Sequence, residues 1–572
     1  MENFHDGHWC NLDISLKNHF RNAQTTWFER KLLGYVFYKS YKNEDVKIDT
    51  IDDFIKTAKL GKEIAEVIRS NLSKCWPFVP SFERGYTWEY FKSYILNFED
   101  YSVGKASAES FIPERITFFI HDLLNITKND SVACIGSGSS TIFEKLVTFS
   151  PRANYEIYED EIRRRSLAYI YKDILGANVN FSSKSCMLSE ASKKYNKICL
   201  TYALGAKTPA LREECSDYIR NYVLERTFLQ KASLDWVLTF LLSEKLSRNG
   251  KMVSLTTFNK LSSRSEVDVK VRKELINSGK VEAVISLPAN LLPHTSVSLA
   301  LIVYSNDNKS VKFIDASNRS TSGYGFLYMK SKLNAFEYYD LDEFFNREGQ
   351  KQSVVELSNF KGDYRLDPKY YISSVNIPYA KAFKEVIFKT NRRDTITKCY
   401  LEKELSNKKT DYRFVSSNDI QDGIICGEPR YISEKSEELQ KMKKYSVGPG
   451  DIIISKNGIT PKVAVVSDDE KFVLTNGNLY ALKLKNKIIN PYFLQAFLES
   501  PTGRASLKDA ITSGMQSLIT VADLEDMVIS CPPLKQQKEI AQRYKKKLQE
   551  LIDLKKNEEG KRKELSDVFD LK

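Results

Sequence analysis

The residues with the clearest chemical potential lie at positions 130–140, which read DSVACIGSGSS. A short apolar run leads to Gly136, Ser137 and Gly138 and then to a helical pattern, which predicts a strand, a tight glycine turn and a helix. Glycines at such a turn let the backbone approach a ligand, and the following helix offers free N–H groups. The segment is a candidate cradle for a nucleotide-like cofactor, although a glycine turn after a strand is also an ordinary connection.

Glu159 adds a second feature of the same kind, because it ends the strand-like run YEIYE at positions 155–159. Doubly wound sheets place at this point the carboxylate that binds ribose hydroxyls. The turn and the acid together favour a cofactor site made by Gly136, Ser137, Gly138 and Glu159.

The elements that must position these residues alternate between strands and helices. Alternation of this kind predicts an α/β fold with a mostly parallel, doubly wound sheet, whose ligands lie at the carboxyl ends of the strands. Apolar runs predict strands at 132–135, 155–159, 195–202, 251–255, 281–287, 298–304 and 311–315. Helical spacing predicts helices at 114–126, 162–175, 231–246, 267–278 and 337–347.

Composition limits the class of protein. A chain of 572 residues with 42% hydrophobic residues should contain several domains with real cores. The net charge of +12 favours a polyanionic partner. Nine cysteines without a CxxC pair and five histidines without a convincing ligand pair predict reduced thiols and no metal site. Neither a membrane-spanning stretch nor a signal peptide is recognisable, so a soluble cytoplasmic protein without membrane contact is expected.

Several segments at positions of about 100–375 carry a resemblance to a known family. They are PERITFFIHDLL, LDWVLTFLLSEKLSRNGKMVSL, VRKELINSGKVEAVISLPANLLPHTSVSLALIVY and VKFIDAS, in this order. Together they resemble the modification subunit of type I restriction systems, a family of N6-adenine DNA methyltransferases. The resemblance implies a Rossmann-like methyltransferase domain that uses S-adenosyl-L-methionine, with LDPKYY at 366–371 near the end of that domain.

The chain departs from this family around the cofactor turn. The family's strand before the glycines starts with Asp, where this chain has Val132. A further acid of the family should fall near SSKSCMLS, where Ser185 stands and cannot act as a carboxylate. These two differences imply weakened binding of S-adenosylmethionine.

The end of the fourth strand departs further. The family has Asn-Pro-Pro followed by Phe or Tyr, and this chain has Thr201, Tyr202, Ala203 and Leu204. The Asn side chain and a proline carbonyl accept the hydrogens of the adenine amine, while the aromatic ring stacks on the flipped base. Thr201 can accept one hydrogen bond and Leu204 offers no aromatic face, so these degenerate positions predict a catalytically impaired enzyme. Two similar segments, NIPY at 376–379 and NPY at 490–492, do not follow the fourth strand and are expected to be turns.

The part after position 395 resembles one target recognition domain of a type I specificity subunit. The segments that carry this are YRFVSSNDIQDGII, VGPGDIIISKNGITPKVAVVS, LTNGNLYALKL, NPYFLQAFLESPTGRASL and ITVADLEDMVISCPPLKQQKEIA. A β-rich α+β domain with a helix from Leu534 onward is expected. Candidate DNA contacts on or near its loops are Lys456, Lys462, Arg504 and Lys508, each of which could equally be a solvated charge.

The last helix carries an apolar stripe through Ile540, Tyr544, Leu548 and Leu551, which a polar stretch around Gly560 interrupts. Specificity subunits have two recognition domains and this chain has one. Two copies that pair through this helix would restore a symmetric site. A monomer with the helix folded on its own core is the alternative.

These observations predict four parts: a helical N-terminal domain at 1–105, a methyltransferase-like domain at 106–380, a target recognition domain at 395–535 and a C-terminal helix at 536–572. The expected function is that of a DNA-binding pseudoenzyme of a restriction-modification or phage-defence system, with double-stranded DNA and restriction or defence subunits as partners. The alternatives are an active N6-adenine methyltransferase and a cofactor sensor without sequence-specific DNA binding.

Overall fold

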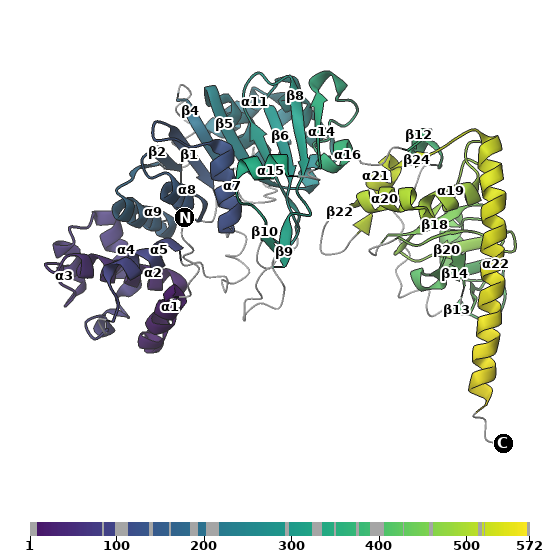
Figure 1. The fold of residues 1–572 in the computed structure, drawn as a ribbon, viewed down its shortest axis with the longest axis horizontal. Helices are drawn as coiled ribbons and strands as arrows, with labels where there is room; N and C mark the ends of the chain where they lie inside the picture. The colour runs from purple at the N-terminus through teal and green to yellow at the C-terminus, as the bar shows by residue number, and fades with distance from the viewer. Residues whose placement is uncertain are drawn as a thin grey trace. The chain divides into compact units, whose positions relative to one another are not determined.

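The chain divides into two compact units, Met1–Ile372 and Ser373–Lys572, each with its own apolar cores (Figure 1). The structure is a computed structural model. It describes residues 8–82, 85–97, 112–136, 141–158, 162–182, 193–201, 217–291, 297–322, 334–347, 351–372, 377–388, 405–426, 428–456, 461–512, 518–519 and 521–568.

Unit 1 begins with a helical segment. Helix α2 starts with a capping box, in which Thr26 Oγ1 accepts from the Glu29 N–H at 3.2 Å and the Glu29 carboxylate accepts from the Thr26 N–H at 2.6 Å. The aromatic core of the segment also packs against Leu167, Ile170 and Tyr171 of α9, so it shares a core with the following domain. The helices are α1 (His8–His19), α2 (Trp27–Lys42), α3 (Ile51–Thr57), α4 (Lys62–Leu72) and α5 (Trp88–Asn97).

Nine strands of the described residues form the central sheet of unit 1, in the order β11-β8-β6-β7-β5-β4-β1-β2-β3. All are parallel except β7 and β11, which run opposite to their neighbours. They are β1 (Ser131–Gly136), β2 (Asn154–Tyr158), β3 (Asn178–Ser182), β4 (Tyr195–Thr201), β5 (Leu246–Thr257), β6 (Val281–Ser286), β7 (Leu299–Tyr304), β8 (Ser310–Asp315) and β11 (Lys351–Glu356). A small hairpin pairs β9 (Ser320–Ser322) with β10 (Asn334–Phe336).

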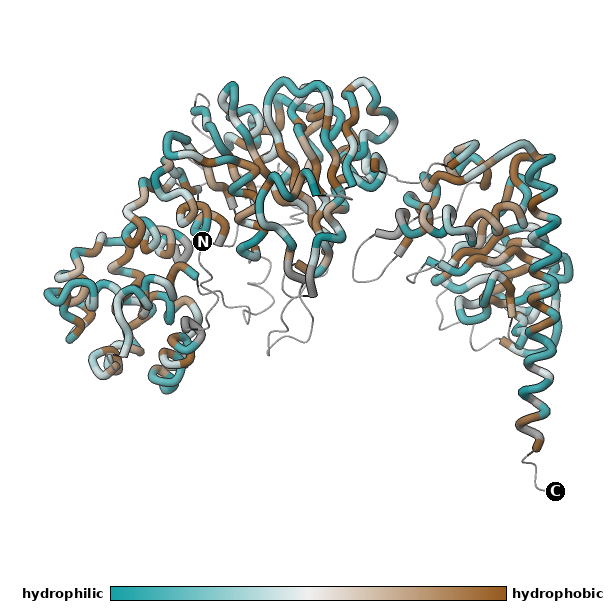
Figure 2. Tube along the Cα trace, viewed as in Figure 1, coloured by the Kyte–Doolittle hydropathy of each residue, from teal (hydrophilic) through white to brown (hydrophobic). Residues whose placement is uncertain are grey.

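Helices cover both faces of this sheet, which confirms the predicted doubly wound α/β fold. One core contains apolar residues of α12 and α14, and the other contains those of α7 and α8. Figure 2 shows the strands as a hydrophobic interior between more polar helices. The helices are α7 (Glu114–Leu124), α8 (Thr141–Phe149), α9 (Ile162–Leu175), α11 (Asp217–Leu224), α12 (Leu234–Glu244), α13 (Asn259–Ser262), α14 (Glu266–Asn277), α15 (Leu341–Asn346) and α16 (Pro368–Ile372).

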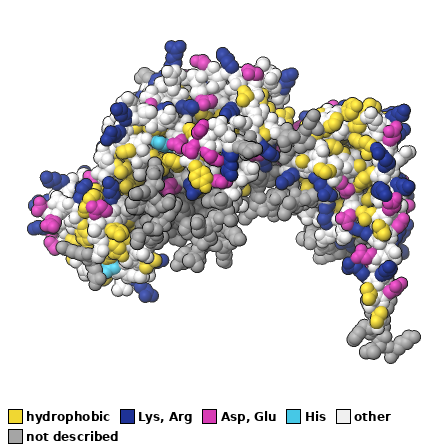
Figure 3. Space-filling model, viewed as in Figure 1, with side chains coloured by type: hydrophobic (Ala, Val, Ile, Leu, Met, Phe, Trp, Pro, Cys, Tyr) yellow, Lys and Arg dark blue, Asp and Glu magenta, His cyan; other side chains and the backbone are white. Residues whose placement is uncertain are grey.

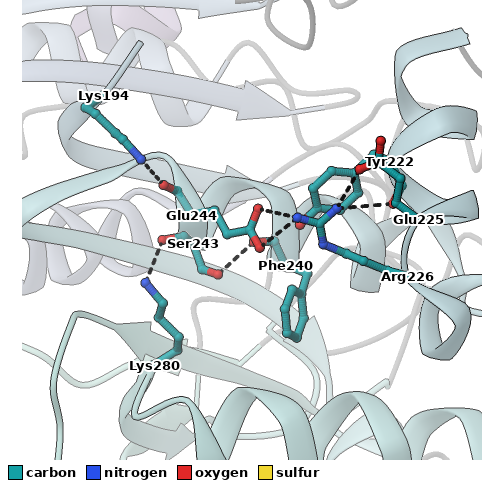
Figure 4. A network of polar contacts seen from close by, with 8 residues as sticks. All are labelled: Lys194, Tyr222, Glu225, Arg226, Phe240, Ser243, Glu244 and Lys280. Atoms are coloured by element: carbon teal, nitrogen blue, oxygen red, sulfur yellow. Dashed lines mark hydrogen bonds and ion pairs between the residues drawn. The ribbon is translucent and has the colours of Figure 1, made fainter. Parts of the chain in front are cut away.

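The carboxyl end of α12 is held by cations from other elements (Figure 4). Lys194 donates to the Glu244 carbonyl oxygen, and Lys280 donates to the Ser243 carbonyl oxygen at 3.2 Å. Arg226 pairs with the Glu244 carboxylate at 3.3 Å. Cations at this end of a helix satisfy its free carbonyl groups and interact favourably with the helix dipole. Because Lys194 and Lys280 precede β4 and β6, this structural network lies at the amino ends of the strands.

Unit 2 is an α+β unit, as the sequence predicts. Its strands form a four-stranded sheet (β13-β17-β14-β20), a three-stranded sheet (β19-β18-β21) and short pairs. The strands are β12 (Ala380–Ala382), β13 (Leu405–Ser406), β14 (Tyr412–Val415), β15 (Ile420–Gln421), β16 (Ile424–Ile425), β17 (Arg430–Ile432), β18 (Ile452–Ser455), β19 (Val463–Val465), β20 (Phe472–Thr475), β21 (Leu479–Leu482), β22 (Ile511–Thr512), β23 (Leu518–Ile519) and β24 (Val528–Ser530). The helices are α18 (Glu437–Met442), α19 (Pro491–Glu499), α20 (Pro501–Asp509), α21 (Val521–Asp526) and α22 (Leu534–Asp567).

Helix α22 is one continuous helix of 34 residues from Leu534 to Asp567, as the sequence predicts, and it runs through Gly560. Its first part is fixed to unit 2 by Gln537, whose amide bonds the Asn490 N–H at 2.7 Å, and by an ion pair between Lys555 and Asp422. The C-terminal end of the helix projects from unit 2 (Figure 1). Leu554 and Leu565 of the helix and Val568 just after it are 66%, 73% and 83% exposed.

Candidate functional site

Gly136 and Thr201 lie side by side at the carboxyl edge of the sheet. Strand β1 ends at Gly136 and β4 ends at Thr201, and the two residues are Cα partners in the parallel pairing of these strands. The fold therefore brings the predicted glycine turn and the substituted end of the fourth strand to one place. Thr201 is half-buried and presents a hydroxyl group, which can accept a hydrogen bond but lacks the carbonyl and amino pair of an amide.

The remaining predicted residues of this edge, Ser137, Gly138, Glu159, Tyr202, Ala203 and Leu204, lie outside the described residues, as does Ser185. The strand that leads to Glu159 pairs with β1 as far as Ile135 and Tyr158. Helix α8 begins at Thr141, soon after the glycine that ends β1. A strand that ends in glycine and leads into a helix has the shape that takes a nucleotide-like cofactor, so the described part of the edge fits such a group.

A polar network on this part of the sheet was not predicted from the sequence. Glu156 of β2 accepts a hydrogen bond from the Tyr195 hydroxyl at 2.9 Å and pairs with Lys193, and Tyr195 also bonds Tyr158. Burial raises the pKa of Glu156, but the hydrogen bonds from Lys193, Tyr158 and Tyr195 outweigh burial and hold that pKa below its ordinary value. The network ties β2 to β4. The only sign of this network in the sequence was the presence of polar residues in two otherwise apolar strands.

A second polar network follows the carboxyl end of β5. Lys260 pairs with Asp235 and donates to the Ser233 hydroxyl at 2.8 Å. Asp268 accepts from Trp236 Nε1 at 2.8 Å and from two serine hydroxyls. Burial raises the pKa of Asp268, whereas these hydrogen bonds lower it, and the result lies below the ordinary value. These contacts join α12, α13 and α14 to one another.

Arg272 fastens the end of unit 1 to this region. Its buried guanidinium donates to the carbonyl oxygens of Lys260 at 2.8 Å, Ser263 at 2.6 Å, Asp363 at 2.8 Å and Tyr364 at 2.9 Å. Burial lowers the pKa of Arg272 to about 10, which still leaves it charged at neutral pH. A buried arginine that serves only carbonyl groups has a structural role.

The candidate DNA contacts Lys456 and Lys462 lie between β18 and β19 of unit 2. Lys462 donates from Nζ to the Ser417 carbonyl oxygen at 2.9 Å. The Lys456 ammonium lies 4.6 Å from the centre of the Tyr480 ring, and burial lowers the pKa of Lys456. Both side chains are therefore held by neighbouring groups of unit 2.

Arg504 and Lys508 are exposed and lie one turn apart on α20. The corner between α19 and α20 places this helix. Ser500 donates to the Phe497 carbonyl oxygen at 2.6 Å, and its hydroxyl accepts from the Gly503 N–H at 3.1 Å. A side chain at position 503 would meet the backbone of α19, so the close approach of the two helices requires glycine there.

The hairpin of β22 and β23 connects these two groups of cations. It follows α20, and the Ile519 N–H donates to the Lys456 carbonyl oxygen at 2.9 Å. Residues 513–517, between the two strands, lie outside the described residues. The fold therefore brings the segment after β18 and the segment after α20 to one end of unit 2.

The segment Asn490-Pro491-Tyr492 begins helix α19 instead of forming the predicted turn, and it does not belong to the sheet edge of unit 1. The Asn490 side chain accepts from the N–H groups of Tyr492 and Phe493 at 3.1 and 3.2 Å and caps α19. Within the described residues, no group of three or more His, Cys, Asp or Glu could hold a metal ion. No helix in this part of the chain is long and apolar enough to cross a lipid bilayer.

Two family models match the chain. Residues 88–378 match the model described as N-6 DNA Methylase, and residues 384–565 match the model described as Type I restriction modification DNA specificity domain. The first match spans more than half of the chain. The two matches confirm the resemblance of the sequence to a methylase joined to a specificity domain. No curated protein matches the chain.

Solved structures are also similar. The methyltransferase subunit of the type I restriction-modification system from Streptococcus thermophilus is 16% identical, with 59% of this chain and 79% of that chain covered and a TM-score of 0.41. The type IIG restriction endonuclease BpuSI is 11% identical, with 94% of this chain and 75% of that chain covered and a TM-score of 0.45.

Proposed function

Because the chain belongs to the N-6 DNA methylase family, we propose that it is a DNA-binding protein of a restriction-modification or phage-defence system whose own methyl transfer is impaired. It recognises double-stranded DNA through unit 2, which carries the specificity-domain sequence. Unit 1 acts as a methyltransferase-like scaffold, and the protein works in the cytoplasm.

The observation that carries this proposal is the end of β4. Thr201 stands beside Gly136, at the point where an N6-adenine methyltransferase needs an amide to accept the hydrogens of the adenine amine. A threonine hydroxyl accepts one hydrogen bond but does not reproduce the amide, and Leu204 supplies no aromatic ring at the position where the family stacks one on the flipped base. The adenine would therefore be neither held nor activated.

S-adenosyl-L-methionine would be held, in this proposal, by Gly136, Ser137, Gly138 and Glu159. When bound, the cofactor supplies the methyl group as an electrophile. The glycines would let the backbone approach it, and the Glu159 carboxylate would accept hydrogen bonds from the ribose hydroxyls. Val132 and Ser185 lack the carboxylates expected at their positions, so we expect weaker binding than in the family.

We further propose that restriction or defence subunits act with this chain, and that two copies pair through the projecting end of α22. The exposed side chains of Leu554, Leu565 and Val568 support the pairing, because a second helix would remove this apolar surface from water. Two copies would present two recognition units to a symmetric DNA site.

The alternative is an active, sequence-specific N6-adenine methyltransferase. It is favoured by the retained juxtaposition of Gly136 and Thr201 at the edge of an intact doubly wound sheet. In that case, residues other than an asparagine amide accept the adenine hydrogens.

Titration with S-adenosylmethionine, followed by transfer of a tritiated methyl group to genomic DNA that lacks adenine methylation, separates the two functions. We expect DNA binding without transfer. Methyl transfer by the wild-type chain that is lost when Gly138 is replaced by Val would establish the active methyltransferase and refute the proposal of impaired transfer. Absence of both DNA binding and transfer would refute both.

A further inference from the structure

The backbone of Lys456 is held on two sides. Its N–H donates to the Asn478 carbonyl oxygen at 2.9 Å, and its own carbonyl oxygen accepts from the Ile519 N–H at 2.9 Å. These bonds join the end of β18 to the β20–β21 connection on one side and to β23 on the other. The Cα atom of Lys456 therefore has a fixed position although the residue follows the end of a strand.

The side chain of Lys456 is also held in place. Its ammonium lies over the ring of Tyr480, 4.6 Å from the ring centre. That ring packs against the core of unit 2, and its hydroxyl donates to the Ile519 carbonyl oxygen at 2.9 Å. Burial raises the pKa of Tyr480 to about 12, so the hydroxyl stays protonated and keeps this bond at neutral pH. The fixed ring of Tyr480 therefore holds the side chain of Lys456, whereas lysine side chains are ordinarily mobile.

The three N–H donors of this ammonium have no acceptor among the described residues, although the side chain is half-buried. Other lysines of unit 2 are paired: Lys384 with Asp526 at 3.0 Å, Lys545 with Asp468 at 3.4 Å and Lys555 with Asp422. A partly desolvated cation without an acceptor is costly unless a ligand supplies one. Its position therefore points to a ligand with hydrogen-bond acceptors.

The cations on α20 differ from Lys456 because they are exposed. Arg504 and Lys508 are exposed on one helix face, and solvent surrounds their long side chains. Figure 3 shows Lys and Arg side chains interspersed with Asp and Glu on the visible face of unit 2, so charge alone does not mark a binding surface there. Mobile exposed cations suit phosphates, which carry no sequence information, whereas reading a base requires a side chain that is held in one place.

We propose that Lys456 reads a base, with its ammonium held over Tyr480 and donating to the N7 and O6 acceptors of a guanine in the major groove, while Arg504 and Lys508 contact phosphates. This assignment rests on the proposed recognition of DNA by unit 2. Guanine is the base whose major-groove edge offers two adjacent acceptors to a cation.

The test begins with the full-length protein and selection of its preferred sites from a library of random duplexes. Affinities for the selected site and for single-position variants are then measured for three proteins: wild type, Lys456→Met and Lys508→Ala. Methionine keeps an unbranched stem against Tyr480 and removes only the charge. We expect Lys456→Met to lose about 10-fold preference for guanine at one position and to keep the preferences elsewhere. Lys508→Ala should weaken binding to all sequences equally and reduce the salt slope by about one unit.

A chemical variant of the DNA makes the result independent of how the protein variants fold. Replacing the selected guanine by 7-deazaguanine removes N7, so wild-type protein should bind the modified site several-fold more weakly. Lys456→Met should not distinguish the two DNAs. The assignment is overturned if the wild-type protein selects a site but 7-deazaguanine leaves its affinity unchanged at every selected guanine. That result would leave DNA recognition by unit 2 intact. Wild-type protein that binds no duplex would overturn both.

Discussion

Removing one member of the buried pair Lys31 and Glu144 should strongly destabilise unit 1. Lys31 belongs to α2 of the N-terminal helical segment, and Glu144 lies in α8, the helix after the glycine turn. Their relative exposures are 5% and 2%, and Lys31 Nζ lies 3.7 Å from Glu144 Oε2. The second carboxylate oxygen of Glu144 is buried and has no hydrogen-bond partner among the described residues. Replacing Lys31 by Met would therefore leave an uncompensated buried charge.

The magnitude follows from the distance. Two unit charges 3.7 Å apart attract by about 4.5 kcal/mol at an effective dielectric constant of about 20. Removing one partner of a buried ion pair destabilises proteins by about 3–5 kcal/mol, because the remaining charge stays desolvated. We expect Lys31→Met to lower the free energy of unfolding by this amount. In the double variant Lys31→Met with Glu144→Met, most of the loss should be recovered, because apolar side chains of similar volume replace the whole pair.

Urea unfolding followed by tryptophan fluorescence measures both variants. The matched control is Lys270→Met, which breaks an ion pair with Glu266 at 2.6 Å on the exposed face of α14. This pair is shorter but fully hydrated, so its loss should leave the unfolding free energy unchanged within error. The reasoning fails if Lys31→Met and Lys270→Met have the same effect, or if the double variant is no more stable than Lys31→Met.

Three further predictions concern the glycines, an acid and the last helix. Gly503→Ala should lower the unfolding free energy by about 1–3 kcal/mol, since a Cβ atom would lie 2.6 Å from the Phe497 carbonyl carbon. The control is Gly560→Ala, because a Cβ atom there would meet nothing within 4 Å. In denaturant unfolding it should leave the unfolding free energy unchanged or raise it. Equal losses of unfolding free energy in the two variants would contradict the close approach of α19 and α20. The pKa of Asp268 is lowered in the folded chain. Its carboxylate therefore contributes to the unfolding free energy above about pH 4, and this contribution is lost as the pH falls further. Asp268→Asn should therefore make the unfolding free energy depend less on pH below about pH 4, and an unchanged acid slope would refute this. A chain that ends at Lys555 should sediment as a monomer where the full chain sediments as a dimer, and a monomeric full chain would refute the pairing.

The order of strands and helices was predictable from the sequence because apolar periodicity reports which faces of an element are buried. The runs at 132–135, 281–287 and 298–304 are almost purely apolar, and each is a strand between covered faces. Strand β3 was not predicted, because NVNFS lies at the sheet edge and only Val179 is fully buried. The helix from Leu534 onward was predictable even through Gly560, since a helix whose backbone bonds are local tolerates one exposed glycine at a cost of about 1 kcal/mol.

Motif spacing by itself determined the family resemblance and the candidate residues, because a glycine turn and the end of a strand have local sequence signatures. Only the tertiary structure decided which of these residues meet. It placed Thr201 beside Gly136 through the pairing of β4 with β1, and it showed that Lys462 is engaged by Ser417 while Lys456 lies over Tyr480. Contacts between segments distant in sequence depend on packing, and no local pattern encodes them.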